Sequence, residues 1–133
     1  MTIRTLVNAA VVLALAIGFG ACGGSNSPSS PDPGNNGTIA ATIVIDATGN
    51  VTPRDVTVTA GSRVTFTNNH NTSHQMASDP HPEHTQCPEI NSVGFLTAGQ
   101  TRTTGNLNTA RTCGFHDHNL PDSAGLQGRI IIQ

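Results

Sequence analysis

Large aromatic side chains are scarce in this chain. Its 133 residues include four Phe but no Trp and no Tyr, and only 35% of the residues are hydrophobic. A folded core must therefore be small and aliphatic, which limits the chain to one domain. Lysine is absent as well, and the formal net charge is -2. A nucleic-acid-binding protein needs a basic surface for the phosphates, so the composition excludes that class.

The histidines, by contrast, are concentrated in one part of the chain. All six lie between positions 70 and 118, as His70, His74, His81, His84, His116 and His118. Imidazole nitrogens are common ligands of zinc and copper, so the clustering indicates a metal site. The chain shows no nucleophile elbow, no phosphate-binding glycine loop and no suggestively spaced pair of carboxylates. We therefore do not expect an enzyme.

Residues 1–21 have the pattern of an export signal. Arg4 is followed by an apolar run over 9–19, which is shorter than the ~20 residues that a membrane-spanning helix needs. This length is typical of a signal peptide. Two small residues precede Cys22, as in the lipobox of bacterial lipoproteins, although Phe19 stands where Leu is usual. We predict a lipoprotein signal peptide, a lipid on Cys22, and a location in the periplasm or at the cell surface. An ordinary secretory signal is the alternative.

A polar segment over 22–37 follows the signal. It consists almost wholly of Gly, Ser, Asn, Pro and Asp, so it cannot bury apolar surface and is predicted to be a flexible tether. No Lys or Arg lies beside Cys22, so attachment to a membrane would rest on the lipid alone. The folded domain is then 38–133, small enough for a cross-link or a bound metal to matter to its stability.

Thr, Val and Ile alternate with period two through this domain, which predicts β-strands. Val56 and Val58, and then Val64 and Phe66, point to one face on either side of a turn, so 55–68 is predicted to be a hairpin. Further strands are predicted at 39–45, 102–107 and 128–133, the last covered on both faces, with a turn at 94–100 and a helical turn at 88–92. Such a pattern favours an all-β antiparallel sandwich or barrel.

The first histidine cluster follows the predicted hairpin. His70 lies in an asparagine-rich turn, and such turns occupy the surface, so we expect it to be solvated. His74 begins an extended segment, in which Met76 would share its face. Met76 is expected in the core, with a role as a soft metal ligand as the alternative.

The other two clusters lie in a loop and on a strand. His81 and His84 stand in a proline-containing loop, where surface and ligand roles are equally compatible with the sequence. His116 and His118 are two apart, so in an extended chain they face the same side and can hold one ion. Asp117 would face away, or would orient one of the rings.

These stretches together resemble the cupredoxin superfamily, particularly its small exported domains. The similar segments are 56–69 leading to His74, the turn at 98–100, and a histidine-bearing strand end that runs into 126–132. The resemblance implies a Greek-key β-sandwich. It also implies a copper ion at one end, held by one histidine from the middle of the chain and by ligands from the last loop.

The chain departs from the blue-copper pattern of this superfamily. Cys113 comes before the final histidine pair, and no Met follows that pair. The Phe115–His118 segment looks like a subgroup in which the thiolate is absent and the site is all imidazole. For that subgroup the ligand candidates are His74, His81, His84, His116 and His118, and the metal is copper, with zinc as a possibility. Cys87 and Cys113 are then free to form a disulfide, which would add roughly 3 to 4 kcal/mol to the stability of an exported domain.

The sequence thus predicts an exported, copper-binding, cupredoxin-like lipoprotein that handles copper or transfers electrons. It would contact the membrane through its lipid and exchange copper or electrons with a protein partner. Two alternatives stay open. One is a type 1 blue-copper electron carrier that uses Cys113 together with His74 and His116. The other is a structural or interaction domain that binds no metal and whose histidines are surface residues.

Overall fold

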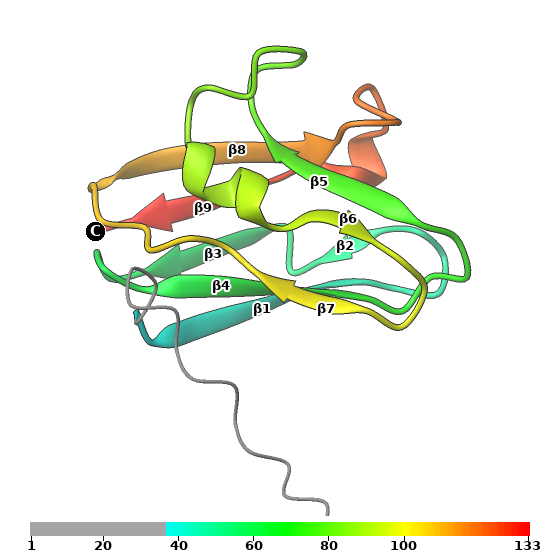
Figure 1. Ribbon diagram of the computed structural model, residues 1–133, viewed down its shortest axis with the longest axis horizontal. Helices are drawn as coiled ribbons and strands as arrows, with labels where there is room; N and C mark the ends of the chain where they lie inside the picture. The colour runs from blue at the N-terminus through cyan, green and yellow to red at the C-terminus, as the bar shows by residue number, and fades with distance from the viewer. Residues whose placement is uncertain (1–36) are drawn as a thin grey trace, which may run out of the picture. The chain divides into compact units, whose positions relative to one another are not determined.

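The computed structural model describes residues 37–133. The predicted signal peptide, the lipidated Cys22 and almost all of the predicted tether lie outside the described residues. Figure 1 shows the strands and two 3-10 helices that follow. They are β1 (Ile39–Ile45), β2 (Val51–Thr52), β3 (Asp55–Val58), β4 (Arg63–Asn68), β5 (His74–Ser78), η1 (Pro88–Ser92), β6 (Gly94–Leu96), β7 (Thr101–Thr103), β8 (Arg111–Asp117), η2 (Ala124–Leu126) and β9 (Gly128–Ile132).

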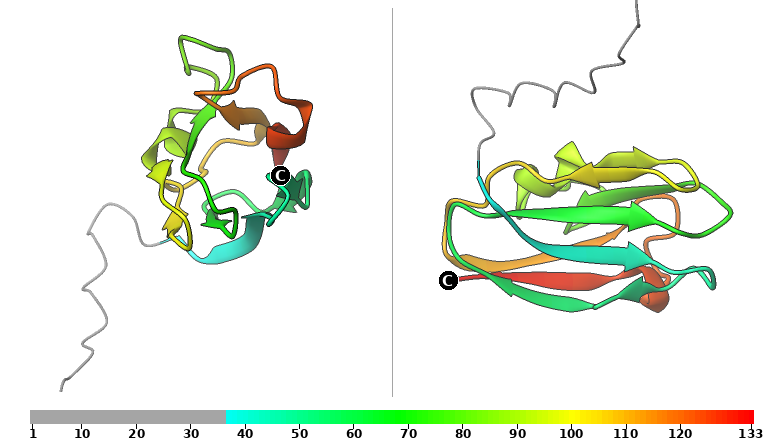
Figure 2. Two further views of the ribbon diagram at one scale, coloured as in Figure 1. Left: turned by 90° about the vertical axis from the view of Figure 1, so that its right-hand side faces the viewer. Right: turned by 90° about the horizontal axis from the view of Figure 1, so that it is seen from below.

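The strands form two sheets that pack face to face, so the predicted β-sandwich is confirmed. One sheet has the order β2-β1-β4-β7 and the other the order β3-β9-β8-β5-β6. The views in Figure 2 show the strands running along the length of the domain, with the loops at its two ends. The sheets are mixed, because β1 pairs with β4 and β3 pairs with β9 in parallel. The other strand pairs are antiparallel, as predicted.

The predicted hairpin over 55–68 is also wrong. β3 and β4 belong to different sheets, because the chain crosses between the layers at residues 59–62. Val56 and Phe66 are buried as predicted. A period-two pattern shows which side chains face the core, but it does not show which strand lies alongside, so a crossing and a hairpin look the same in sequence.

The ends of the predicted strands differ in detail from the observed ones. β7 ends at Thr103, and Leu107 makes only an isolated bridge to Ser62. Burial alternates along β9, because Ile131 is partly exposed while Ile130 and Ile132 are buried. Only one face of this strand is therefore fully covered, whereas the sequence predicted that both would be. The predicted helical turn at 88–92 is confirmed as η1.

The core between the sheets is aliphatic apart from one aromatic pair. Phe66 and Phe115 meet edge to face, with ring centroids 5.1 Å apart. Met76 is fully buried among the core residues, as predicted. Cys87 and Cys113 form a disulfide, which confirms the predicted pairing and links the start of η1 to β8. No helix in residues 37–133 has the length and apolar character needed to cross a membrane.

Candidate metal centre

The loop over 79–86 carries His81 and His84 and projects beyond the ends of its flanking elements, β5 and η1 (Figure 1). Both ends of the loop are fixed to one residue of β8. The Asp79 amide donates a hydrogen bond to the Gly114 carbonyl at 3.0 Å, and the Gly114 amide donates to Gln86 Oε1 at 2.8 Å. The disulfide begins at the next residue, Cys87. The loop is therefore held against β8 by covalent and hydrogen bonds together.

Strand pairing places His116 next to this loop. β5 and β8 are antiparallel, and Ala77 lies opposite His116 while Ser78 lies opposite Phe115. Because side chains alternate along a strand, Phe115 enters the core and His116 faces the other side of the sheet. His116 is nevertheless buried, with 2% of its surface exposed.

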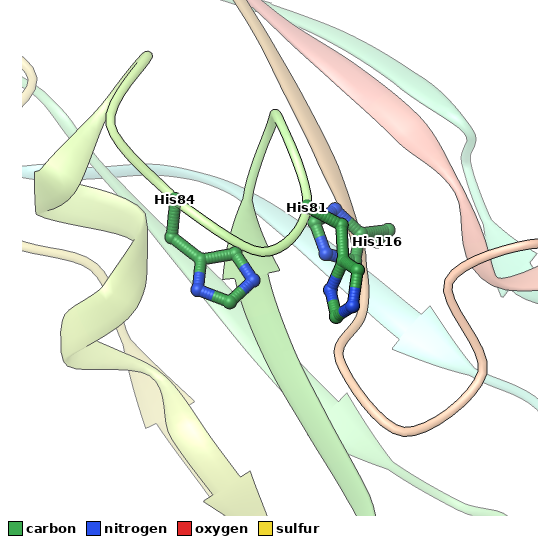
Figure 3. Close-up of side chains that lie close together, drawn as sticks. All are labelled: His81, His84 and His116. Carbon is green, nitrogen blue, oxygen red and sulfur yellow. The ribbon is translucent and has the colours of Figure 1, made fainter.

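Three histidines converge between the loop and the strand. A ring nitrogen from each of His81, His84 and His116 lies within 4.8 Å of those from the other two. Figure 3 shows that His81 and His84 come from the loop and His116 from β8. His118 borders the group, with its Nδ1 3.2 Å from Nε2 of His84. We name these four residues the imidazole cluster.

His116 is arranged as a metal ligand. Its Nδ1 donates a hydrogen bond to Asp79 Oδ1 at 2.6 Å, so the other ring nitrogen, Nε2, carries a free lone pair. Nε2 is buried and has no hydrogen-bond partner. Buried polar atoms are normally satisfied, so an orphaned imidazole nitrogen beside two other imidazoles fits the binding of a metal ion.

The approach of Asp79 to His116 depends on Gly114. A Cβ atom at position 114 would overlap the Oδ2 atom of Asp79. A side chain there would push the carboxylate away from β8, and with it the hydrogen bond that orients His116. Glycine is therefore required for a close contact rather than for its backbone flexibility.

His84 is held in an unfavourable backbone conformation within the loop. Its φ of 53° lies in the left-handed region, which costs a residue other than glycine about 1–2 kcal/mol. Such strain persists where the surrounding structure fixes the chain, often at functional sites. Burial lowers the pKa of the His84 imidazole, and positive charge on His116, His118 and His81 would lower it further. His84 is therefore neutral at pH 7, the form that binds a metal.

His74 lies apart from the imidazole cluster, although the sequence placed it in the same ligand set. Its Nδ1 donates a hydrogen bond to Asp117 Oδ2 at 2.6 Å, and its Nε2 is 2.9 Å from Nδ1 of His70. Asp117 follows His116 in β8, so the two side chains leave opposite faces of the sheet. His70 lies in the loop between β4 and β5, as predicted, but it is half-buried rather than fully solvated, and its ring lies against that of His74.

The sequence did not predict which carboxylate supports His116. Asp79 orients His116, whereas the sequence suggested Asp117 for such a role. Asp117 instead contacts His74. The signal for Asp79 was its position directly after a strand, but its partner depends on how β5 and β8 are paired. The structure also removes the type 1 alternative, since Cys113 is in a disulfide and its thiolate is not available.

Comparisons with known proteins bear on the fold. No protein-family model matches the sequence, and a search of curated proteins finds no match either. Among solved structures, the oxidized form of plastocyanin from Dryopteris crassirhizoma is similar at 22% identity and a TM-score of 0.53, covering 69% of this chain and 99% of the plastocyanin. Amicyanin from Paracoccus versutus is similar at 19% identity and a TM-score of 0.56, covering 71% of this chain and 81% of the amicyanin.

A purple cupredoxin from Nitrosopumilus maritimus is similar at 17% identity and a TM-score of 0.54, covering 70% of this chain and 99% of that protein. The chain has a cupredoxin-like fold. The resemblance drawn from the sequence is thereby confirmed at the level of the fold.

Proposed function

We propose that this protein binds a copper ion at the imidazole cluster, through His81, His84 and His116, with His118 available as a further ligand. The orphaned Nε2 atom of His116, held by Asp79 and adjacent to two other imidazoles, is the observation that carries this proposal. Neutral imidazoles suit Cu(II) and Zn(II), and a given nitrogen site usually binds Cu(II) more tightly. Zinc is therefore the competing occupant.

We propose copper handling, meaning storage or delivery to a protein partner, as the role of the site. His81 is exposed, so an ion bound to it would be accessible to an incoming ligand. No thiolate is present among the described residues to hold the ion in addition. Electron transfer is the second candidate. It is favoured by the structural neighbours, since a fern plastocyanin mutant is described in oxidized and reduced forms. A copper ion, when bound, would supply one-electron redox chemistry at this surface.

We further propose that the protein is an exported lipoprotein of the bacterial periplasm or cell surface. The support is the signal-like sequence of residues 1–21 followed by Cys22. The Cys87–Cys113 disulfide is compatible with export, because such bridges persist in oxidising compartments. Mass spectrometry of the protein from bacterial membranes would test this, since cleavage before Cys22 with added acyl chains is expected and an intact residue 1 would contradict it.

Titration with Cu(II) of the full-length protein carrying Cys22→Ser, which removes the thiol outside the disulfide, tests the metal site. We expect the His81→Ala/His84→Ala variant to lose one equivalent of tightly bound copper relative to the wild type. A Thr85→Ala variant in the same loop, whose side chain is exposed, should bind like the wild type. The adduct should absorb weakly in the visible range, because no thiolate donates charge to copper. An unchanged stoichiometry in the double histidine variant would refute the proposal.

The two roles can be separated by two further measurements. Copper handling predicts transfer of Cu(II) from the protein to a competing chelator within minutes. Electron transfer predicts that reduction and reoxidation occur reversibly while the ion stays bound, as seen by voltammetry.

A further inference from the structure

A second set of potential ligand atoms converges in the loop between β4 and β5. Nδ1 of His70 lies 2.9 Å from Nε2 of His74. The Thr72 hydroxyl is 2.9 Å from the same His70 nitrogen and 3.5 Å from the same His74 nitrogen. Two imidazole nitrogens and one hydroxyl oxygen thus surround a single point at the surface, since Thr72 is exposed and His70 is half-buried.

His74 has the same carboxylate support as His116. Asp117 Oδ2 accepts the Nδ1 proton of His74 at 2.6 Å, just as Asp79 accepts that of His116. The Nε2 atom of His74 therefore carries a lone pair directed at His70. A histidine that ligates a metal usually donates its other ring proton to a carboxylate or a carbonyl, and this contact fixes the ring and raises its basicity.

The position of His70 is set by its surroundings rather than by a metal. Its amide donates a hydrogen bond to Asn68 Oδ1 at 2.9 Å. Its ring lies over Gly49, where a Cβ atom would come within 3.2 Å of the His70 Cε1 atom. Gly49 also has a φ of 78°, which disfavours any other residue. The contacts with Asn68 and Gly49 therefore hold the His70 imidazole beside that of His74.

The two ring nitrogens are joined by a hydrogen bond, with 2.9 Å between His70 Nδ1 and His74 Nε2. Both atoms can serve as metal ligands once the proton between them leaves. A given nitrogen site usually binds Cu(II) more tightly than Zn(II), so Cu(II) is the expected ion.

We propose that His70 and His74 form a second Cu(II) site, separate from the imidazole cluster. The ion would take the place of the proton that lies between the two rings, and that proton would move to the outward Nε2 atom of His70, so that both rings stay neutral. Thr72 and water molecules would complete the coordination. The two sites lie on opposite faces of the five-stranded sheet, because His116 of the imidazole cluster and Asp117, which supports His74, are consecutive in β8.

Copper stoichiometry tests this proposal. The full-length protein carrying Cys22→Ser, which removes its unpaired thiol, would be titrated with Cu(II) by calorimetry. We expect two equivalents, one of which is lost in the additional His70→Ala variant. An Asn71→Ala variant in the same exposed loop is the matched control and should keep both. A His70→Ala variant that binds as many equivalents as its parent would overturn the proposal.

A spectroscopic measurement gives an independent readout that does not depend on the folding of the His70→Ala variant. In the His81→Ala/His84→Ala variant, the remaining Cu(II) should show a tetragonal electron paramagnetic resonance spectrum with coupling to two nitrogens. If the His81→Ala/His84→Ala variant binds no copper, the second site is refuted. If that variant loses copper from the imidazole cluster and keeps one equivalent, the second site is supported. The two sites therefore fail or succeed separately.

Discussion

His116 and His74 show how one residue type acquires a directed lone pair. Each ring gives its Nδ1 proton to an aspartate at 2.6 Å, and each is almost fully buried. An imidazole in water exchanges freely between two tautomers. The carboxylate selects one of them, the tautomer in which the lone pair lies on Nε2.

The lowered pKa of His84 predicts a pH dependence of stability. The unfolded chain protonates this residue near its ordinary pKa of 6.5, whereas the folded chain does so only at lower pH. Between these two pKa values only the unfolded chain binds the proton. The free energy of unfolding is therefore at its full value above about pH 6.5 and falls as the pH decreases from 6.5 through the folded pKa. Urea unfolding of the metal-free protein on both sides of this window would measure the effect.

The matched variant for this experiment is His84→Gln, which does not titrate. We expect its stability to decline less than that of the wild type between about pH 7.5 and pH 5. Thr85→Ala, in the same loop, should follow the wild-type profile. Parallel profiles for wild type and His84→Gln would show that the His84 pKa is not lowered.

Among the structural elements, β8 organises both proposed sites. Its alternating side chains supply a core residue in Phe115, a ligand candidate in His116 and a supporting carboxylate in Asp117. Its backbone at Gly114 holds both ends of the loop over 79–86. A substitution in β8 is therefore expected to alter the conformation of the loop over 79–86 as strongly as a substitution within the loop.

The contact between Gly114 and Asp79 yields a prediction for this strand. Gly114→Ala should displace the Asp79 carboxylate and lower the copper affinity of the imidazole cluster about 10- to 100-fold, as Asp79→Ala should. In the Asp79→Ala background, Gly114→Ala should have little additional effect, because the displaced group is already gone. Copper titration of the four proteins measures this coupling.

The control is Asp55→Asn, which removes an exposed carboxylate that binds Arg129 and no histidine. It should leave copper affinity unchanged. If the losses of copper affinity caused by Gly114→Ala and Asp79→Ala are strictly additive in the double variant, Gly114 does not act through Asp79.

The sequence was informative about what each strand contains but not about how strands are paired. The spacing of His116 and Asp117 correctly predicted opposite faces of a strand, because alternation is a local property. The support of His116 by Asp79 could not be predicted, since it requires β5 and β8 to be neighbours in one particular register. The error over the 55–68 hairpin has the same cause, as burial of Val56 and Phe66 is satisfied by either connection.

At the scale of the whole molecule, the Cys87–Cys113 disulfide compensates for a small core. It joins two fully buried residues that are 26 positions apart. We expect a Cys87→Ala/Cys113→Ala variant to lose about 3–4 kcal/mol in free energy of unfolding, because its unfolded chain is no longer constrained. Urea denaturation would measure this loss. Cys22→Ser, which leaves the bridge intact, is the control, and an equal midpoint for both variants would contradict the prediction.

The position of this disulfide also imposes an order on the maturation of the protein. The bridge closes immediately after the histidine loop and three residues before His116, so a chain with reduced thiols would present His81 and His84 without a fixed partner. Thiols stay reduced in the cytosol and are oxidised outside it. We therefore expect oxidation to precede metal loading, so that the copper site would become competent only after the chain has left the compartment of its synthesis.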